Sequence, residues 1–218
     1  MEENKKENTI VKNMVLYGLG GAMSQAAGLI TLPIMTRVLS SHDYGAIEVI
    51  TAATGYFSLL IGLNTMSGLY RFFYAADEQT HDRKSLVSTT FLFVFLTGFM
   101  IALLSILLSP IFSQNLFNDL SYSGIIRLAF SALIPVAVYT YSLCLLRIQN
   151  KALPYILTAV AVSVIYMGSI ILFIAVLHSG ISGYYYSQII ANTIGACIAL
   201  FLSRQYLGFQ FSPYWFKK

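Results

Sequence analysis

Residues 85–110 read SLVSTTFLFVFLTGFMIALLSILLSP and carry no charged side chain. The uncharged run continues to Asn118, well past the roughly 18 apolar residues that mark a helix able to cross a bilayer. Its apolar residues fall on every face instead of alternating, which favours a helix over a barrel strand. The sequence therefore predicts that this segment lies in a membrane.

Four more uncharged runs flank this one, and the longest is interrupted by the turn-like sequence HSGISG at 178–183. Dividing that run in two gives six predicted spanning helices, at about 13–38, 44–70, 86–112, 124–147, 154–177 and 183–206. The predicted fold class is an all-α integral membrane protein, a six-transmembrane-helix bundle over residues 13–206.

The composition excludes several classes of protein. Of the 218 residues, 57% are hydrophobic and only 10% are charged, whereas an average soluble domain is about 25% charged. A soluble fold of this length could not cover its surface with so few charges. A disordered chain needs the opposite composition. A soluble enzyme and a disordered protein are both excluded.

The positions of the basic residues predict the orientation. Eleven of the thirteen Lys and Arg residues fall in the N-terminal segment, the second and fourth connections and the C-terminal segment; the other two are Arg37 and Arg127. Because basic residues concentrate in cytoplasmic loops, residues 1–12 and 207–218 are both predicted to be cytoplasmic. No basic patch gathers on one folded face, so no nucleic-acid partner is predicted.

Sequence motifs of enzymes are not found. The chain contains no Walker A, HExxH or GxSxG motif and no CxxC pair, and these carry nucleotide, metal or nucleophile chemistry. We therefore predict no metal ion, no cofactor and no enzymatic activity.

A few polar residues near the predicted helix ends are candidate site residues. Three arginines each end a predicted helix: Arg37, Arg71 and Arg147. Each serves either as an anchor at the membrane interface or as a phosphate contact through its planar guanidinium. Glu48 lies about one turn into the second predicted helix. It is either a helix-start acid favoured by the macrodipole, the ion-pair partner of Arg37, or the carrier of a coupling proton.

Small residues recur every four positions in the first predicted helix, at Gly20, Ser24 and Gly28. This spacing places them on one face, where they allow a second helix to approach closely. The face serves either static packing within the bundle or a sliding contact that permits rocking.

Several motifs occur in an order that is similar to one family. They are Asn13, Tyr17-Gly18, Leu32-Pro33, Thr36-Arg37-Val38-Leu39-Ser40, Asp43-Tyr44-Gly45 and Gly68-Leu69-Tyr70-Arg71-Phe72-Phe73-Tyr74. The sequence resembles the amino-terminal half of an O-antigen flippase. These flippases are polysaccharide transporters of the multidrug/oligosaccharidyl-lipid/polysaccharide (MOP) exporter superfamily, which also contains the MATE-like transporters.

The resemblance implies a function and a partner. It implies an inner-membrane protein that flips a polyprenyl-diphosphate-linked oligosaccharide for surface polysaccharide biosynthesis. It also implies a V-shaped pair of six-helix lobes, alternating access and a basic cavity, which Arg37, Arg71 and Arg147 could line. Two alternatives stay open: a lobe of a drug or metabolite exporter from the same superfamily, and a non-transporting membrane fragment.

The length differs from that of the family. Its members have twelve to fourteen helices, and six are predicted here, with residues 207–218 lying where a seventh would begin. The chain is thus expected to be a truncated or split product. A second lobe would come from a separate chain or from a homodimer.

Overall fold

The computed structural model describes residues 2–61, 65–75 and 82–206, and this part of the chain contains helices and no strand. The long elements are α1 (Glu2–Val38), α2 (Ser41–Leu60), α3 (Thr65–Ala75), α4 (Asp82–Leu107), α5 (Ser109–Phe117), α6 (Ser123–Ser131), α7 (Leu133–Ile148), α8 (Ala152–Ile170) and α9 (Gly180–Ser203). Short segments are η1 (Leu120–Tyr122), the π-helical η2 (Ile171–Val176) and η3 (Arg204–Tyr206).

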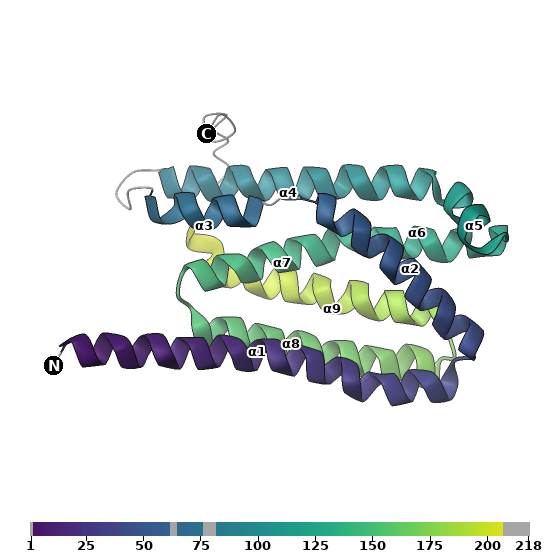
Figure 1. Cartoon of the computed structure of the whole chain (residues 1–218), viewed down its shortest axis with the longest axis horizontal. Helices are drawn as coiled ribbons and strands as arrows, with labels where there is room; N and C mark the ends of the chain where they lie inside the picture. The colour runs from purple at the N-terminus through teal and green to yellow at the C-terminus, as the bar shows by residue number, and fades with distance from the viewer. Residues whose placement is uncertain (1, 62–64, 76–81, 207–218) are drawn as a thin grey trace.

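Most of the long helices lie roughly along one axis, which is horizontal in Figure 1. Helices α1 and α8 lie side by side along one edge, α4 lies along the opposite edge, and α7 and α9 lie between them. The start of α1, the α7–α8 connection and the end of α9 lie at the same end of the bundle. The α1–α2 and α8–α9 connections lie at the other end.

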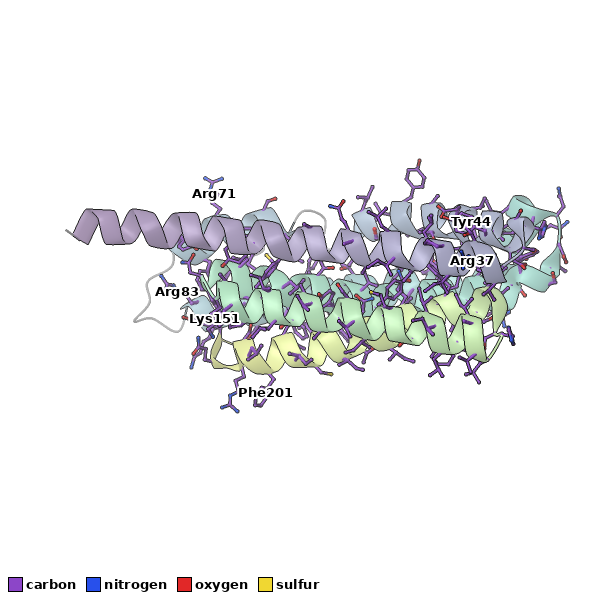
Figure 2. All side chains as sticks on the ribbon, turned by 90° about the horizontal axis from the view of Figure 1, so that it is seen from below. Arg37, Tyr44, Arg71, Arg83, Lys151 and Phe201 are labelled. Carbon is purple, nitrogen blue, oxygen red and sulfur yellow. The ribbon has the colours of Figure 1, made fainter. Side chains whose placement is uncertain are left out.

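These two ends differ in charge. We call the first the basic end, because its connections and helix ends carry six of the described basic residues: Arg71, Arg83, Lys84, Arg147, Lys151 and Arg204. The opposite, distal end carries Arg37 and Arg127. Figure 2 shows Arg71, Arg83 and Lys151 toward one end and Arg37 toward the other. The helix order thus gathers the basic residues as the sequence predicts, and the side of the membrane that each end faces stays a prediction.

Among the described residues, five stretches built of helices are long and apolar enough to cross a membrane: Ser41–Tyr74, which includes the undescribed residues 62–64, and Arg83–Leu107, Leu120–Ile148, Ala152–Val176 and Gly180–Tyr206. An all-α membrane protein is therefore confirmed. Helix α1 is the sixth predicted span and is not among the five, so the count of six stays a prediction. The segment 1–12, predicted as a tail, is helical from Glu2 onward and continuous with α1.

The second predicted helix, 44–70, is wrong as a single helix. Helix α2 ends at Leu60, where Ile61 takes an extended conformation with φ −72° and ψ 120°. Helix α3 resumes at Thr65. An extended residue cannot continue the i to i−4 hydrogen-bond ladder, so this span is built from two shorter helices.

Prolines break the third and fourth predicted helices. The helix expected over 86–112 ends at Leu107, and Pro110 lies in the first turn of α5. The helix expected over 124–147 is interrupted at Ala132, just before Pro135 in the first turn of α7. Proline lacks the N–H that the preceding turn needs and is tolerated in a first turn, which explains both divisions.

The turn predicted over 178–183 is shorter in the structure, because α9 already begins at Gly180. His178 and Gly180 have positive φ values of 49° and 57°. These two left-handed residues reverse the chain within three positions. The rest of the predicted turn is therefore the first turn of α9.

Two buried clusters hold the bundle together. The cluster near the distal end contains four almost completely buried side chains: Ile47, Ile50, Phe130 and Tyr185. The cluster at the basic end contains four more: Leu69, Val87, Tyr141 and Leu145. Tyr141 donates its hydroxyl hydrogen to the Val87 carbonyl, with 2.7 Å between the two oxygens. Hydrophobic burial against neighbouring helices thus fixes the frame on which the candidate site lies.

Candidate functional site

The best-defined polar arrangement surrounds Arg147, in the last turn of α7. Its guanidinium Nη2 donates to the Tyr155 hydroxyl at 2.8 Å. The guanidinium carbon also lies 5.1 Å from the ring centroid of Tyr155 and 5.7 Å from that of Tyr17. Both distances are within the range of a cation–π contact. The side chain is thus held by two helices, α1 and α8, while Arg147 remains exposed.

The chain reversal after α7 explains why Tyr155 reaches Arg147, eight residues before it. Asn150 ends the helix in the left-handed conformation, with φ 56°, a position that asparagine occupies more readily than most residues. The Lys151 N–H then donates to the Leu146 carbonyl at 3.0 Å. Helix α8 begins at once and runs back beside α7, bringing Tyr155 to the guanidinium.

Gly20 allows α1 to reach the same place. A Cβ on Gly20 would lie 3.0 Å from Cε1 of Tyr155, so any side chain there would press on the ring. Tyr17, one turn earlier, packs edge to face on Tyr155 with 5.1 Å between ring centroids. The close approach of α1 and α8 therefore builds the aromatic surface that holds Arg147.

Helix α3 completes this arrangement. The Tyr70 hydroxyl lies close to Arg147 and to the thiol of Cys144. Tyr74 donates its hydroxyl hydrogen to the Ile148 carbonyl at 2.8 Å. We call Arg147, Tyr17, Tyr70 and Tyr155 the arginine–tyrosine site. It joins four helices that are far apart in the sequence.

One member of the site has unused hydrogen-bonding capacity. The Tyr17 hydroxyl oxygen is buried and has no hydrogen-bond partner among the residues that the structure describes. Buried polar groups normally have partners. The Tyr17 ring lies against the guanidinium, so a small shift of this ring would bring an unpaired hydroxyl to the surface beside Arg147. The exposed guanidinium of Arg147 is suited to an oxyanion such as phosphate.

The other two candidate arginines lie elsewhere. Arg71 of α3 is exposed at the basic end, with its guanidinium carbon 5.8 Å from the Phe72 ring centroid. Arg37 is exposed in the last turn of α1, at the distal end (Figure 2). The structure thus places Arg71 and Arg147 at one end of the bundle and separates Arg37 from both. Nothing local in the sequence indicates this separation beyond the alternation of the helices.

Glu48 lies in a second polar region, at the distal end. It lines a cavity of about 150 Å³ together with Tyr44 of α2, Tyr166 of α8 and Tyr184 of α9. The Tyr44 hydroxyl lies close to the Glu48 side chain. No ion pair joins Glu48 to Arg37 within the described part of the chain. The four-residue spacing of Tyr44 and Glu48 could have revealed their contact, whereas Tyr166 and Tyr184 carry no local signal.

The predicted small-residue face divides into different environments. Gly20 is buried against Tyr155, whereas a Cβ on Gly28 would meet no atom within 4 Å. The side chain of Ser24 lies outside the described residues. In place of one continuous contact, the structure shows a tight contact at Gly20 and open space at Gly28.

Among the described residues, no group of three or more His, Cys, Asp and Glu side chains converges in a way that could hold a metal ion. Among known proteins, one family model matches the chain over residues 10–217, and its description is "Polysaccharide biosynthesis protein". No curated protein and no solved structure matches.

Proposed function

Because the chain belongs to the polysaccharide biosynthesis protein family, we propose that it flips a polyprenyl-diphosphate-linked oligosaccharide across the cytoplasmic membrane. It acts as a transporter and performs no covalent chemistry. Such a substrate has three parts that need different surroundings. The diphosphate needs cations, the sugars need water or polar side chains, and the polyprenol needs lipid.

The arginine–tyrosine site is the observation that carries this proposal. An exposed guanidinium fixed by a hydrogen bond at 2.8 Å and two aromatic contacts is ordered before the ligand arrives, which reduces the entropy lost on binding. A charge-assisted hydrogen bond to phosphate is about twice as strong as a neutral one. Arg147 therefore serves as the principal diphosphate contact, and Arg71 as a second basic group at the same end.

The orientation follows from the charges. The basic end faces the cytoplasm, in agreement with the positive-inside rule, and both termini lie there. The lipid-linked oligosaccharide is then captured from the cytoplasmic leaflet at the level of its phosphate groups, and its sugars extend along the bundle toward the distal end. Turnover uses an ion gradient or the removal of product, since the sequence has no nucleotide-binding motif.

A closed transport path needs a second wall. We propose that this wall is another six-helix lobe, either a separate chain or a second copy, as the resemblance to two-lobed flippases implies. Rocking of the two lobes then exposes the sugars to the outer side.

The test is flipping of a fluorescently labelled lipid-linked glycan in proteoliposomes that contain this chain alone or with a second lobe. We expect flipping by one of these preparations and a strong loss in Arg147→Gln. Arg204→Gln is the matched control. It removes the same charge at the same end, from a side chain whose guanidinium carbon lies 4.7 Å from the Phe201 ring centroid. Phe201 lies on the face opposite Arg71 (Figure 2).

Two results would contradict the proposal. If neither preparation flips the glycan, the chain is no flippase. If Arg204→Gln reduces flipping as much as Arg147→Gln does, only the total charge of the basic end matters and the arginine–tyrosine site has no specific role.

A further inference from the structure

The distal cavity has the chemistry of a carbohydrate-binding pocket. It is lined by residues of four helices, α1, α2, α8 and α9, and the polar residues among them are Glu48, Tyr44, Tyr166, Tyr184 and Thr31. All three tyrosines are half-buried, and Glu48 is exposed. The carboxylate is therefore accessible, and the rings lie at the wall of an open space of about 150 Å³.

A sugar ring needs this combination of groups. Its C–H faces pack on aromatic rings, which offer an apolar surface with a polar edge. Its hydroxyl groups donate to a carboxylate, which can accept several hydrogen bonds. The exposed Glu48 carboxylate lines the cavity beside Tyr44, and its lone pairs can accept from the hydroxyl groups of a ligand. A divalent metal ion fits less well, because it needs more oxygen ligands than one carboxylate provides.

The pocket is aligned with the arginine–tyrosine site. Helix α1 contributes Tyr17 to that site and Thr31 to the pocket; helix α8 contributes Tyr155 and Tyr166 in the same way. At 1.5 Å per residue, the two regions lie about 16–21 Å apart along these helices. One extended ligand can therefore occupy both, with its anionic group at the basic end and a sugar at the distal end.

We propose that the pocket lined by Glu48, Tyr44, Tyr166 and Tyr184 is a carbohydrate subsite that binds a sugar of the substrate remote from the diphosphate. This inference rests on the proposed function, since it gives the two ends of one lipid-linked oligosaccharide separate sites. Glu48 and the tyrosine hydroxyls bind the sugar hydroxyls, and Gly28 leaves room for the ring. The pocket thereby distinguishes glycosylated from sugar-free lipid.

The test compares two probes on the full chain in nanodiscs, with binding measured by native mass spectrometry. One probe is lipid-linked oligosaccharide extracted from membranes of the source cells, and the other is polyprenyl diphosphate without sugar. Wild type should prefer the glycosylated lipid. Glu48→Gln should reduce that preference by about tenfold, as expected for a weakened hydrogen bond to a charged group. Binding of the sugar-free lipid should not change.

A second variant fills the pocket without removing its polar groups. Gly28 lines the cavity, and a Cβ there meets no atom within 4 Å. Gly28→Leu should therefore exclude the sugar and leave the fold intact. Gly168→Leu is the matched control, since Gly168 is also exposed and open but does not line the pocket. It should bind both probes as wild type does.

The possible outcomes distinguish failure of the carbohydrate subsite from failure of the flippase proposal. If wild type binds both probes and the pocket variants keep the wild-type preference, the carbohydrate subsite is refuted and the flippase proposal stands. If wild type binds neither probe, both proposals fall. If Glu48→Gln abolishes only a pH dependence of binding and leaves the preference for glycosylated lipid unchanged, Glu48 is a proton site and the subsite is refuted.

Discussion

Gly195→Ala should destabilise the bundle although it adds only one methyl group. Gly195 is buried in α9, where α7 and α8 approach it from two sides. An added Cβ would collide with Cγ2 of Val162 and lie 2.9 Å from Cδ2 and Cε2 of Tyr139. Val162 is β-branched and has one strongly preferred rotamer in a helix, so it cannot rotate away without cost.

Two opposing effects decide whether Gly195→Ala raises or lowers the stability of the folded bundle. Overpacking a closed contact costs about 1–3 kcal/mol, whereas replacing glycine by alanine in a helix gains at most about 1 kcal/mol. The gain is smaller still in a membrane, because spanning helices form before they pack. We therefore expect a net loss of about 1–2 kcal/mol, which lowers the apparent melting temperature by a few degrees.

The assay is thermal unfolding of the detergent-solubilised chain, followed by fluorescence-detected size exclusion. Gly168→Ala is the matched control, because a Cβ at Gly168 meets no atom within 4 Å and only the favourable helix effect remains. Gly168→Ala should melt at or slightly above the wild-type temperature. If Gly195→Ala is as stable as Gly168→Ala, the packing of α9 against α7 and α8 described above is incorrect.

Three further changes test other parts of the structure. Tyr141→Phe should cost about 1 kcal/mol, because it removes the buried hydrogen bond to the Val87 carbonyl; thermal unfolding measures it, and an unchanged melting temperature would contradict the bond. Ser40→Ala should also cost about 1 kcal/mol, since the Ser40 hydroxyl accepts from the Asp43 N–H at 3.1 Å and caps α2; a loss below about 0.3 kcal/mol would refute the cap. Arg147→Lys should weaken binding of polyprenyl diphosphate about tenfold, because an ammonium group binds phosphate as a point charge. Vesicle flotation measures the affinity, and equal affinity of wild type and Arg147→Lys would show that the planar geometry of the guanidinium is unimportant for binding.

The sequence predicted the arrangement of the helices better than their continuity. Long uncharged runs and the positions of the basic residues were sufficient for a membrane bundle with alternating connections. Pro110 and Pro135 mark the two breaks, but Pro33 lies inside α1 without ending it, so the positions of the prolines alone could not have distinguished a break from a continuous helix. The break at Ile61 depends on an extended backbone that is stabilised by packing, for which a single sequence gives little signal.

The candidate sites were only partly predictable. Arg147 was selected as one of three arginines that end predicted helices, and nothing in the sequence ranks it above Arg37 and Arg71. Its partners Tyr17 and Tyr155 belong to helices whose contact is set by the reversal after α7 and by the glycine at Gly20. Tyrosine is common near membrane interfaces, so composition alone could not distinguish these two rings from the rest of the aromatic residues.

The same pair of helices supports both proposed binding regions, and this constrains how transport can work. If α1 slid along α8, Tyr17 would leave Arg147 and the distal pocket would lose Thr31 or Tyr166 at the same time. Gly20 packs closely on Tyr155, and closely packed contacts resist such sliding. On the proposed function, the lobe therefore holds diphosphate and sugar at a fixed separation. Alternating access must then come from motion between two lobes, as in hinge or rocking transitions, and the contact of α1 with α8 should be preserved throughout the transport cycle.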